Sequence, residues 1–102
     1  MDRKEFIKNE INQDPMDPFN HYLLAIELYK EKAIEASFKQ FERIITDFPH
    51  YVATYYTYAN ALLTEIKEDR AEEIIRLGII EAEKKGAAKA LKELKQLLEL
   101  NF

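Results

Sequence analysis

The chain matches itself when it is shifted by 34 residues. Under this shift Pro15 falls on Pro49, and Ala25 falls on Ala59. Apolar residues also fall on apolar residues, namely Leu28 on Leu62, Phe41 on Ile75 and Ile45 on Ile79. Within one period the apolar residues recur at intervals of three and four, which is the spacing of a helix face. A period of this length with two helices per unit predicts a helical repeat, in which each unit buries its apolar face against its neighbours.

Few residues interrupt these helices. The 102 residues include 2 Gly and 3 Pro, too few for a β-sandwich or barrel, which needs a turn about every ten residues. The sequence therefore predicts an all-α fold. Helices are expected over residues 2–14, over two segments between residues 18 and 48, and over residues 52–65, 69–85 and 87–100. The short connections predict that neighbouring helices pack antiparallel.

Helix ends are marked by Asp, Pro and Gly. Pro18 suits the first turn of a helix, with Asp17 as its N-terminal cap. Lys84 and Lys85 followed by Gly86 are typical of a helix C-terminus. Cations favour that end of the helix dipole, and Gly readily adopts the left-handed conformation that ends a helix.

The 34-residue period with two helices per unit resembles the tetratricopeptide repeat family, in particular its small, stand-alone bacterial members. The resemblance is carried by a Leu-Ala-x-x-Leu core on the first helix, a small residue and an aromatic on the second, and a terminal proline. In the first unit these are Leu24, Ala25, Leu28, Ser37, Phe41 and Pro49. In the second unit the matching core positions hold Tyr58, Ala59, Leu62, Ala71 and Ile75.

Some positions depart from the family pattern. Lys32 and Ile66 stand where the family usually has a Gly between the two helices of a unit. Glu83 stands where the second unit would have its terminal Pro, so the last helix of that unit is expected to run a turn longer, to Lys85. Gly78 occupies a position that the family usually gives to Ala.

The resemblance implies a single domain over residues 1–102, folded as an antiparallel helix-turn-helix solenoid with two repeats. We expect the repeats at residues 18–51 and 52–85, an N-terminal half-repeat helix at residues 2–14, and a capping helix at residues 87–100. Because a solenoid is stabilised by contacts between neighbouring units, the two flanking helices are expected to complete the stack.

Composition argues against several classes of function. Cys is absent, which excludes disulfides and thiolate metal sites. The net charge of −4 argues against generic nucleic-acid binding, which depends on neutralising phosphates. The N-terminal residues lack the apolar run of a signal peptide, and no segment approaches the ~20 apolar residues of a membrane span. We therefore expect a cytoplasmic protein that binds neither nucleic acid nor membrane.

The polar residues do not form an evident catalytic group. Ser37 is the only Ser, and we expect it to be a small core residue that bonds back to its own helix. With Gly78 and Gly86 as its only glycines, the sequence contains no Gly-rich phosphate-binding loop. His21 and His50 with acidic residues leave metal-assisted hydrolysis open as an alternative. We nevertheless expect no metal, no cofactor and no enzymatic activity.

A lysine stripe offers another alternative. Lys85, Lys89 and Lys92 share one face at the last helix. Such a face is either an anion-docking surface or the solvated outer side of a capping helix, which must be polar where no further repeat stacks. We favour the capping interpretation.

The tyrosines are the most informative feature for function. Tyr51, Tyr55, Tyr56 and Tyr58 lie within eight residues, and on a helix Tyr55 and Tyr58 share a face from which Tyr56 is rotated away. The resemblance implies that the first helix of each repeat lines a concave groove for a partner peptide. The peptide-binding residues implied in this way are Phe19, Tyr22, Leu23, Ile26, Tyr29, Tyr56 and Asn60.

The same positions indicate the kind of partner. Some family members bind a peptide carboxylate with lysines, and Tyr22 and Tyr56 occupy the matching positions here. We therefore expect an apolar or mixed peptide, and the predicted function is a non-enzymatic scaffold for a protein or peptide whose identity is unknown. Two alternatives stay open: the terminal helices already cover these side chains, or the chain forms a homodimer through the groove or an end of the stack.

Overall fold

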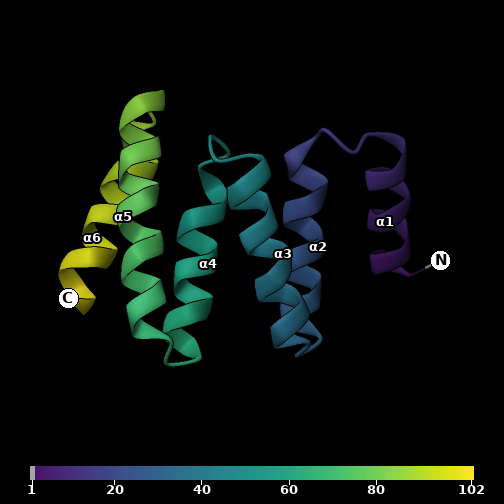
Figure 1. Cartoon of the computed structure of the whole chain (residues 1–102), viewed down its shortest axis with the longest axis horizontal. Coiled ribbons are helices and arrows are strands. Elements are labelled where there is room, and N and C mark those ends of the chain that lie inside the picture. Colours follow the sequence, from purple (N-terminus) through teal and green to yellow (C-terminus); the bar gives the residue numbers. More distant parts are fainter. Residues whose placement is uncertain (1) are drawn as a thin grey trace. The chain divides into compact units, whose positions relative to one another are not determined.

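The computed structural model describes residues 2–102, and six α-helices account for most of them (Figure 1). They are α1 (Arg3–Gln13), α2 (Pro18–Lys30), α3 (Ile34–Asp47), α4 (Ala53–Thr64), α5 (Glu68–Lys85) and α6 (Ala88–Asn101). No strand occurs among residues 2–102, so the predicted all-α fold is confirmed. The helices form two compact units, α1–α3 in the first and α4–α6 in the second, with the division between Phe48 and Pro49.

The predicted start of the second helix is confirmed. Pro18 is the first residue of α2, and the Asp17 carboxylate accepts a hydrogen bond from the Phe19 N–H at 3.0 Å. The Asp2 carboxylate caps α1 in the same way, accepting from the Glu5 N–H at 2.8 Å. Each cap satisfies an N–H group that has no partner within its own helix.

Three helices end with the same backbone motif, in which one left-handed residue turns the chain. The residues are Lys32 after α2, Ile66 after α4 and Gly86 after α5, with φ angles of 65°, 59° and 70°. In each case the next N–H donates to a carbonyl in the last turn of the helix, at 2.8–2.9 Å. The predicted left-handed Gly86 and the extension of α5 to Lys85 are thus confirmed. Lys32 and Ile66 adopt a conformation that favours Gly, which makes these two turns strained.

In the first unit α2 and α3 pack antiparallel through small residues (Figure 1). Ala25 and Ser37 are both fully buried, and the Ser37 hydroxyl donates to the Ala25 carbonyl at 2.8 Å. The expectation that Ser37 bonds back to its own helix is therefore wrong. The two helices approach so closely at this point that the Ser37 hydroxyl reaches the Ala25 carbonyl of α2. A carbonyl oxygen has two lone pairs, so it can accept this bond in addition to one within α2.

Helix α1 packs against α2. Ile7 is 2% exposed and supplies the apolar contact, which is worth about 1.5–3 kcal/mol for a fully buried side chain. Two ion pairs flank it, Arg3 with Glu27 at 2.7 Å and Lys4 with Glu31 at 3.0 Å. Exposed ion pairs of this kind contribute at most about 1 kcal/mol to stability. They therefore orient α1 on α2, and the apolar contact of Ile7 stabilises the packing of the two helices more.

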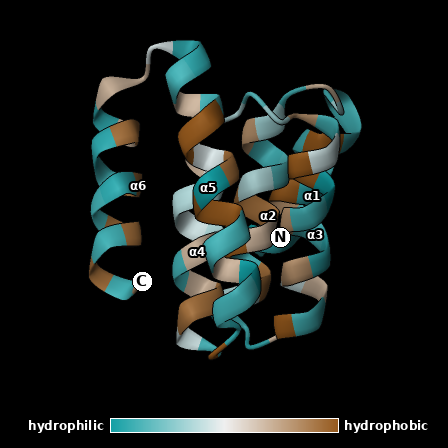
Figure 2. Ribbon diagram, turned by 60° about the vertical axis from the view of Figure 1, so that its left-hand side comes forward, coloured by the Kyte–Doolittle hydropathy of each residue, from teal (hydrophilic) through white to brown (hydrophobic). Residues whose placement is uncertain are grey.

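In the second unit α4 packs antiparallel to α5, and α6 contacts both. Ala59 and Ala71, each one period after Ala25 and Ser37, are fully buried. Figure 2 shows α6 with hydrophobic residues along one side and hydrophilic residues along the other. The second unit therefore repeats the small-residue contact of the first, and its third helix, α6, is held by burying one of its sides.

Gly78 is the residue at which all three helices of the second unit meet. A Cβ atom built on Gly78 would lie 2.5 Å from the Tyr55 Cβ of α4 and 3.0 Å from the Leu94 Cδ1 of α6. Real Cβ atoms do not approach another Cβ so closely, because this atom is tied to the backbone and cannot rotate away. The replacement of the family's Ala by Gly at this position is explained by the packing of Tyr55.

We predict that Gly78→Ala destabilises the protein by about 1–2 kcal/mol. Ala should add about 1 kcal/mol through helix propensity, but overpacking a dense core typically removes 1–3 kcal/mol, and the clash involves the Tyr55 Cβ. Urea unfolding followed by circular dichroism measures the change. A gain in the free energy of unfolding would show that helix propensity outweighs the contact and that α4 and α5 do not approach this closely.

We predict that Ile66→Gly raises the free energy of unfolding by about 1 kcal/mol, and that Lys32→Gly has an effect of the same sign. A left-handed non-Gly residue costs roughly 1–2 kcal/mol, which exceeds the entropy that Gly loses on folding. The matched control is Glu65→Gly, because Glu65 directly precedes Ile66 and has φ −88°, so Gly relieves no strain there. Equal effects of Gly at Glu65 and Ile66 would contradict the strain.

Candidate functional site

The first unit places five of the predicted peptide-binding residues on one helix, α2. They recur at intervals of three and four and therefore follow one broad face. Phe19 is 49% exposed, and the other four are partly exposed. These residues, which we call the α2 row, are Phe19, Tyr22, Leu23, Ile26 and Tyr29.

The packing of α2 on α3 fixes the orientation of the α2 row. Ala25 is completely buried between the two helices, which fixes the rotation of α2 about its axis. The Tyr29 ring stacks on Phe38 of α3, with ring centroids 6.1 Å apart and an interplanar angle of 10°. Partly exposed side chains on a rigid helix lose little entropy on binding a partner.

The second unit sorts the clustered tyrosines as the sequence predicted. Tyr55 and Tyr58 are 1% and 2% exposed, whereas Tyr56 is 39% exposed. One turn along α4, the Asn60 amide donates to the Tyr56 carbonyl at 2.9 Å. This bond holds the side-chain nitrogen of Asn60 close to the backbone of α4. The side-chain oxygen is the other polar atom of this amide group. Tyr56 therefore offers an apolar ring, with Asn60 one helical turn away.

Tyr55 has a structural role instead. Its hydroxyl donates to the Pro49 carbonyl at 2.6 Å and so ties the segment before α4 to the core. Burial raises the pKa of Tyr55 to about 12, and the negative charge of Glu81 adds to the shift. Both effects disfavour the phenolate, so Tyr55 stays neutral and continues to donate this bond at ordinary pH.

The two histidines occupy different environments. In the first unit the His21 Nε2 is hydrogen-bonded to the Pro15 carbonyl at 2.7 Å, and its ring centroid lies 5.5 Å from that of Phe48. Beside it is a cavity of about 10 Å³, which is room for roughly one water molecule. In the second unit the His50 carbonyl accepts a bond from Lys85 at 3.5 Å. Within residues 2–102, no three His, Asp or Glu side chains come close enough to hold a metal ion.

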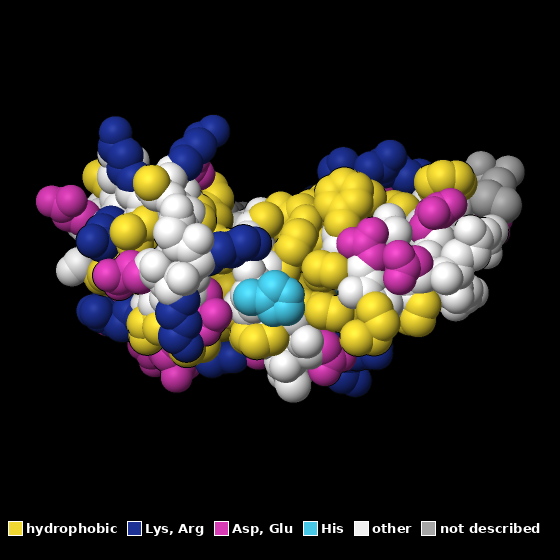
Figure 3. All heavy atoms as spheres, turned by 90° about the horizontal axis from the view of Figure 1, so that it is seen from above, with side chains coloured by type: hydrophobic (Ala, Val, Ile, Leu, Met, Phe, Trp, Pro, Cys, Tyr) yellow, Lys and Arg dark blue, Asp and Glu magenta, His cyan; other side chains and the backbone are white. Residues whose placement is uncertain are grey.

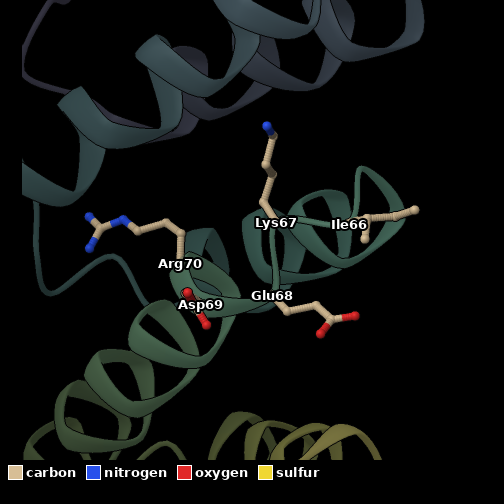
Figure 4. Close-up of a pocket in the computed structure, with 5 residues that line it drawn as sticks. All are labelled: Ile66, Lys67, Glu68, Asp69 and Arg70. Carbon is tan, nitrogen blue, oxygen red and sulfur yellow. The ribbon is translucent and has the colours of Figure 1, made fainter.

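The predicted lysine face and the turn between α4 and α5 are two further exposed surfaces. Lys85, Lys89 and Lys92 are all solvent-exposed. An open depression lies at the turn between α4 and α5, but Figure 4 shows its charged side chains pointing away from one another. A ligand site needs polar groups that converge on one point, so this depression is not a candidate. The residues around it are Ile66, Lys67, Glu68, Asp69 and Arg70.

Several exposed apolar residues were not predicted as site residues. Met16 is 75% exposed in the turn between α1 and α2, and Leu77 and Ile80 are 41% and 49% exposed on α5. Met16 could have been found from its place between two Asp-Pro pairs, because a turn keeps such a residue on the surface. Leu77 and Ile80 carry no such local signal. Among the described residues, no helix has the length and apolar character needed to cross a membrane.

Comparison with solved structures finds the same helical arrangement. The chain is 32% identical to a tetratricopeptide repeat domain protein from Salinibacter ruber, whose solution NMR structure matches with a TM-score of 0.81 over 86% of this chain and 89% of that one. A crystal structure of a tetratricopeptide repeat domain protein from the same organism is 30% identical, with a TM-score of 0.76 over 83% and 94% of the two chains. No protein-family model and no curated protein sequence matches the chain. A fold of this type suggests a protein-interaction module.

We predict that Tyr55 makes the protein less stable at alkaline pH. Because the pKa of Tyr55 is raised above its ordinary value of 10, its contribution is complete below about pH 10 and is lost as the pH rises towards 12. Tyr55→Phe should remove this part of the pH dependence and, at neutral pH, cost about 1 kcal/mol through the lost hydrogen bond. Urea midpoints measured between pH 7 and about 11.5 test this.

The control for this prediction is Tyr56→Phe. Tyr56 is 39% exposed, so the urea midpoint of this variant should fall with rising pH as steeply as that of the wild type. An unchanged slope in Tyr55→Phe would show that another group causes the loss of stability.

Proposed function

The chain belongs to the tetratricopeptide repeat family, and from this membership we propose that it is a non-enzymatic module that binds a peptide or protein segment. The contacts would come from the first helix of each repeat. They are the α2 row together with Tyr56 and Asn60 of α4. The absence of Cys suits a reducing compartment, and we propose the cytoplasm as its location.

The observation that carries this proposal is a repeated pattern of burial. Ala25 and Ala59 are fully buried at matching positions of α2 and α4. Three residues before each of them is a tyrosine, Tyr22 or Tyr56, that stays at least partly exposed. Core residues are buried, and surface positions without a function seldom hold an aromatic residue. Two partly exposed tyrosines at the same repeat position therefore support a role in binding.

Tyrosine also suits the chemistry of such a contact. Its ring brings a large apolar area with few rotatable bonds, and its hydroxyl can bond to a polar group of the partner. Tyr22 and Tyr56 replace the lysines with which some family members bind a carboxylate. The proposed partner therefore binds through apolar side chains and not through a terminal carboxylate.

We predict that Tyr22→Ala combined with Tyr56→Ala abolishes partner binding and leaves the helical content unchanged. Both rings are partly exposed, so the loss of apolar contact should exceed the loss of core packing. Affinity capture from native lysate, compared with wild type, gives the readout. The matched control is Leu77→Ala with Ile80→Ala, which removes exposed apolar groups from α5 instead.

Retention of the same partner by the tyrosine variant would refute the contacts proposed for α2 and for α4. Measurement of molecular mass over a range of concentrations tests the alternative of self-association. A wild-type dimer that becomes a monomer in the tyrosine variant would assign these side chains to a homodimer interface.

A further inference from the structure

The turn between α1 and α2 presents apolar side chains that the first unit does not bury. Met16 is 75% exposed and Phe19 is 49% exposed. The turn contains Pro15 and Pro18, whose rings restrict the backbone, and the Asp17 N–H donates to the Asp14 carbonyl at 3.3 Å. The two apolar side chains are therefore displayed on a stiff support, which reduces the entropy lost when a partner binds.

The surroundings of these two side chains carry negative charge. Residues 9–22, which include the turn, contain three acidic residues and no Lys or Arg. Among the described residues, the Glu10 and Asp14 carboxylates have no ion-pair partner, unlike Glu27 at the other end of α2, which pairs with Arg3. The whole of residues 1–48 has 7 basic and 10 acidic residues, a net charge of −3.

The charged groups of α3 do not reverse this balance. Arg43 and Asp47 line the small cavity beside His21, so one positive and one negative group face that side of α2. Figure 3 looks down on the end of the helices where the turn lies. It shows hydrophobic side chains together with Asp and Glu side chains over the first unit, with Lys and Arg side chains along the edges of this region.

The helix ends at this turn also favour a cation. The last turn of α1 has no basic residue, so the partial negative charge of its C-terminal carbonyls is not balanced within α1. The N-terminus of α2 has the opposite partial charge, but its first residue is Pro18 and the Asp17 carboxylate caps it. The electrostatic preference for a positive group is therefore strongest beside Asp14, at the C-terminal end of α1.

We propose that this surface, which we call the acidic turn and which consists of Glu10, Asp14, Met16, Asp17 and Phe19, binds a partner segment with an apolar side chain next to Lys or Arg. The apolar side chain contacts Met16 and Phe19, and the cation lies near Glu10 and Asp14. This inference rests on the proposed function, because Phe19 belongs to the α2 row. It adds that the partner is basic, which the row alone does not determine.

The test uses two fluorescein-labelled synthetic peptides of the same length, one alternating Leu and Phe with Lys and the other with Glu in place of every Lys. Fluorescence anisotropy should show that the Lys peptide binds at least about tenfold more tightly at low salt, and that raising the salt concentration reduces the difference. Glu10→Gln with Asp14→Asn should weaken binding of the Lys peptide about fivefold, as expected for two partly screened charge pairs.

The matched control is Glu93→Gln with Glu99→Gln on α6, which changes the net charge by the same amount in the second unit. It should leave the affinity for the Lys peptide unchanged. The inference is overturned if the Lys peptide does not bind, if both peptides bind equally, or if both double variants weaken binding to the same extent. If the Glu peptide binds and Tyr22→Ala with Tyr56→Ala abolishes that binding, the proposed function stands and the acidic turn does not.

Discussion

The packing of each helix pair depends on a close approach at two small residues. In the first unit Ala25 and Ser37 are fully buried, and one period later Ala59 and Ala71 are fully buried as well. A larger side chain at any of these positions would separate the helices and leave the surrounding apolar residues without contacts. Ser37 adds a hydrogen bond to the Ala25 carbonyl that forms only at this separation. The approach therefore determines which faces of α2 and α4 are buried, and so which side chains remain exposed.

The turns that join the paired helices contain strained backbone, which the close packing of each pair requires. After α2, α4 and α5 the chain reverses through the same left-handed backbone conformation, but only α5 has Gly there. Lys32 and Ile66 adopt this conformation against their steric preference. Ile66 is 77% exposed, so no contact with the core explains why this position holds Ile. The strain is tolerated because antiparallel packing of each pair requires a short turn, and the packing is worth more than the strain.

The candidate binding residues share a physical character, although they lie in two units. Tyr56 and the α2 row keep part of their apolar area exposed on helices whose other faces are buried. The first unit adds a displayed Met16 and uncompensated carboxylates at the neighbouring turn. An apolar surface beside negative charge fits a basic, apolar partner better than a peptide that binds through its terminal carboxylate.

Sequence spacing was enough to predict the helices, their repeat register, the left-handed Gly86 and the separation of Tyr55 from Tyr56 between core and surface. These features follow from spacing along one chain segment, because residues three and four apart share a helix face. The contacts between helices were needed to identify the hydrogen-bond partner of Ser37, the reason for Gly78, and the exposure of each residue in the α2 row. Each of these depends on the distance between helices that are separated in sequence. A periodic pattern shows which face of a helix is apolar, but not how close the next helix comes to it.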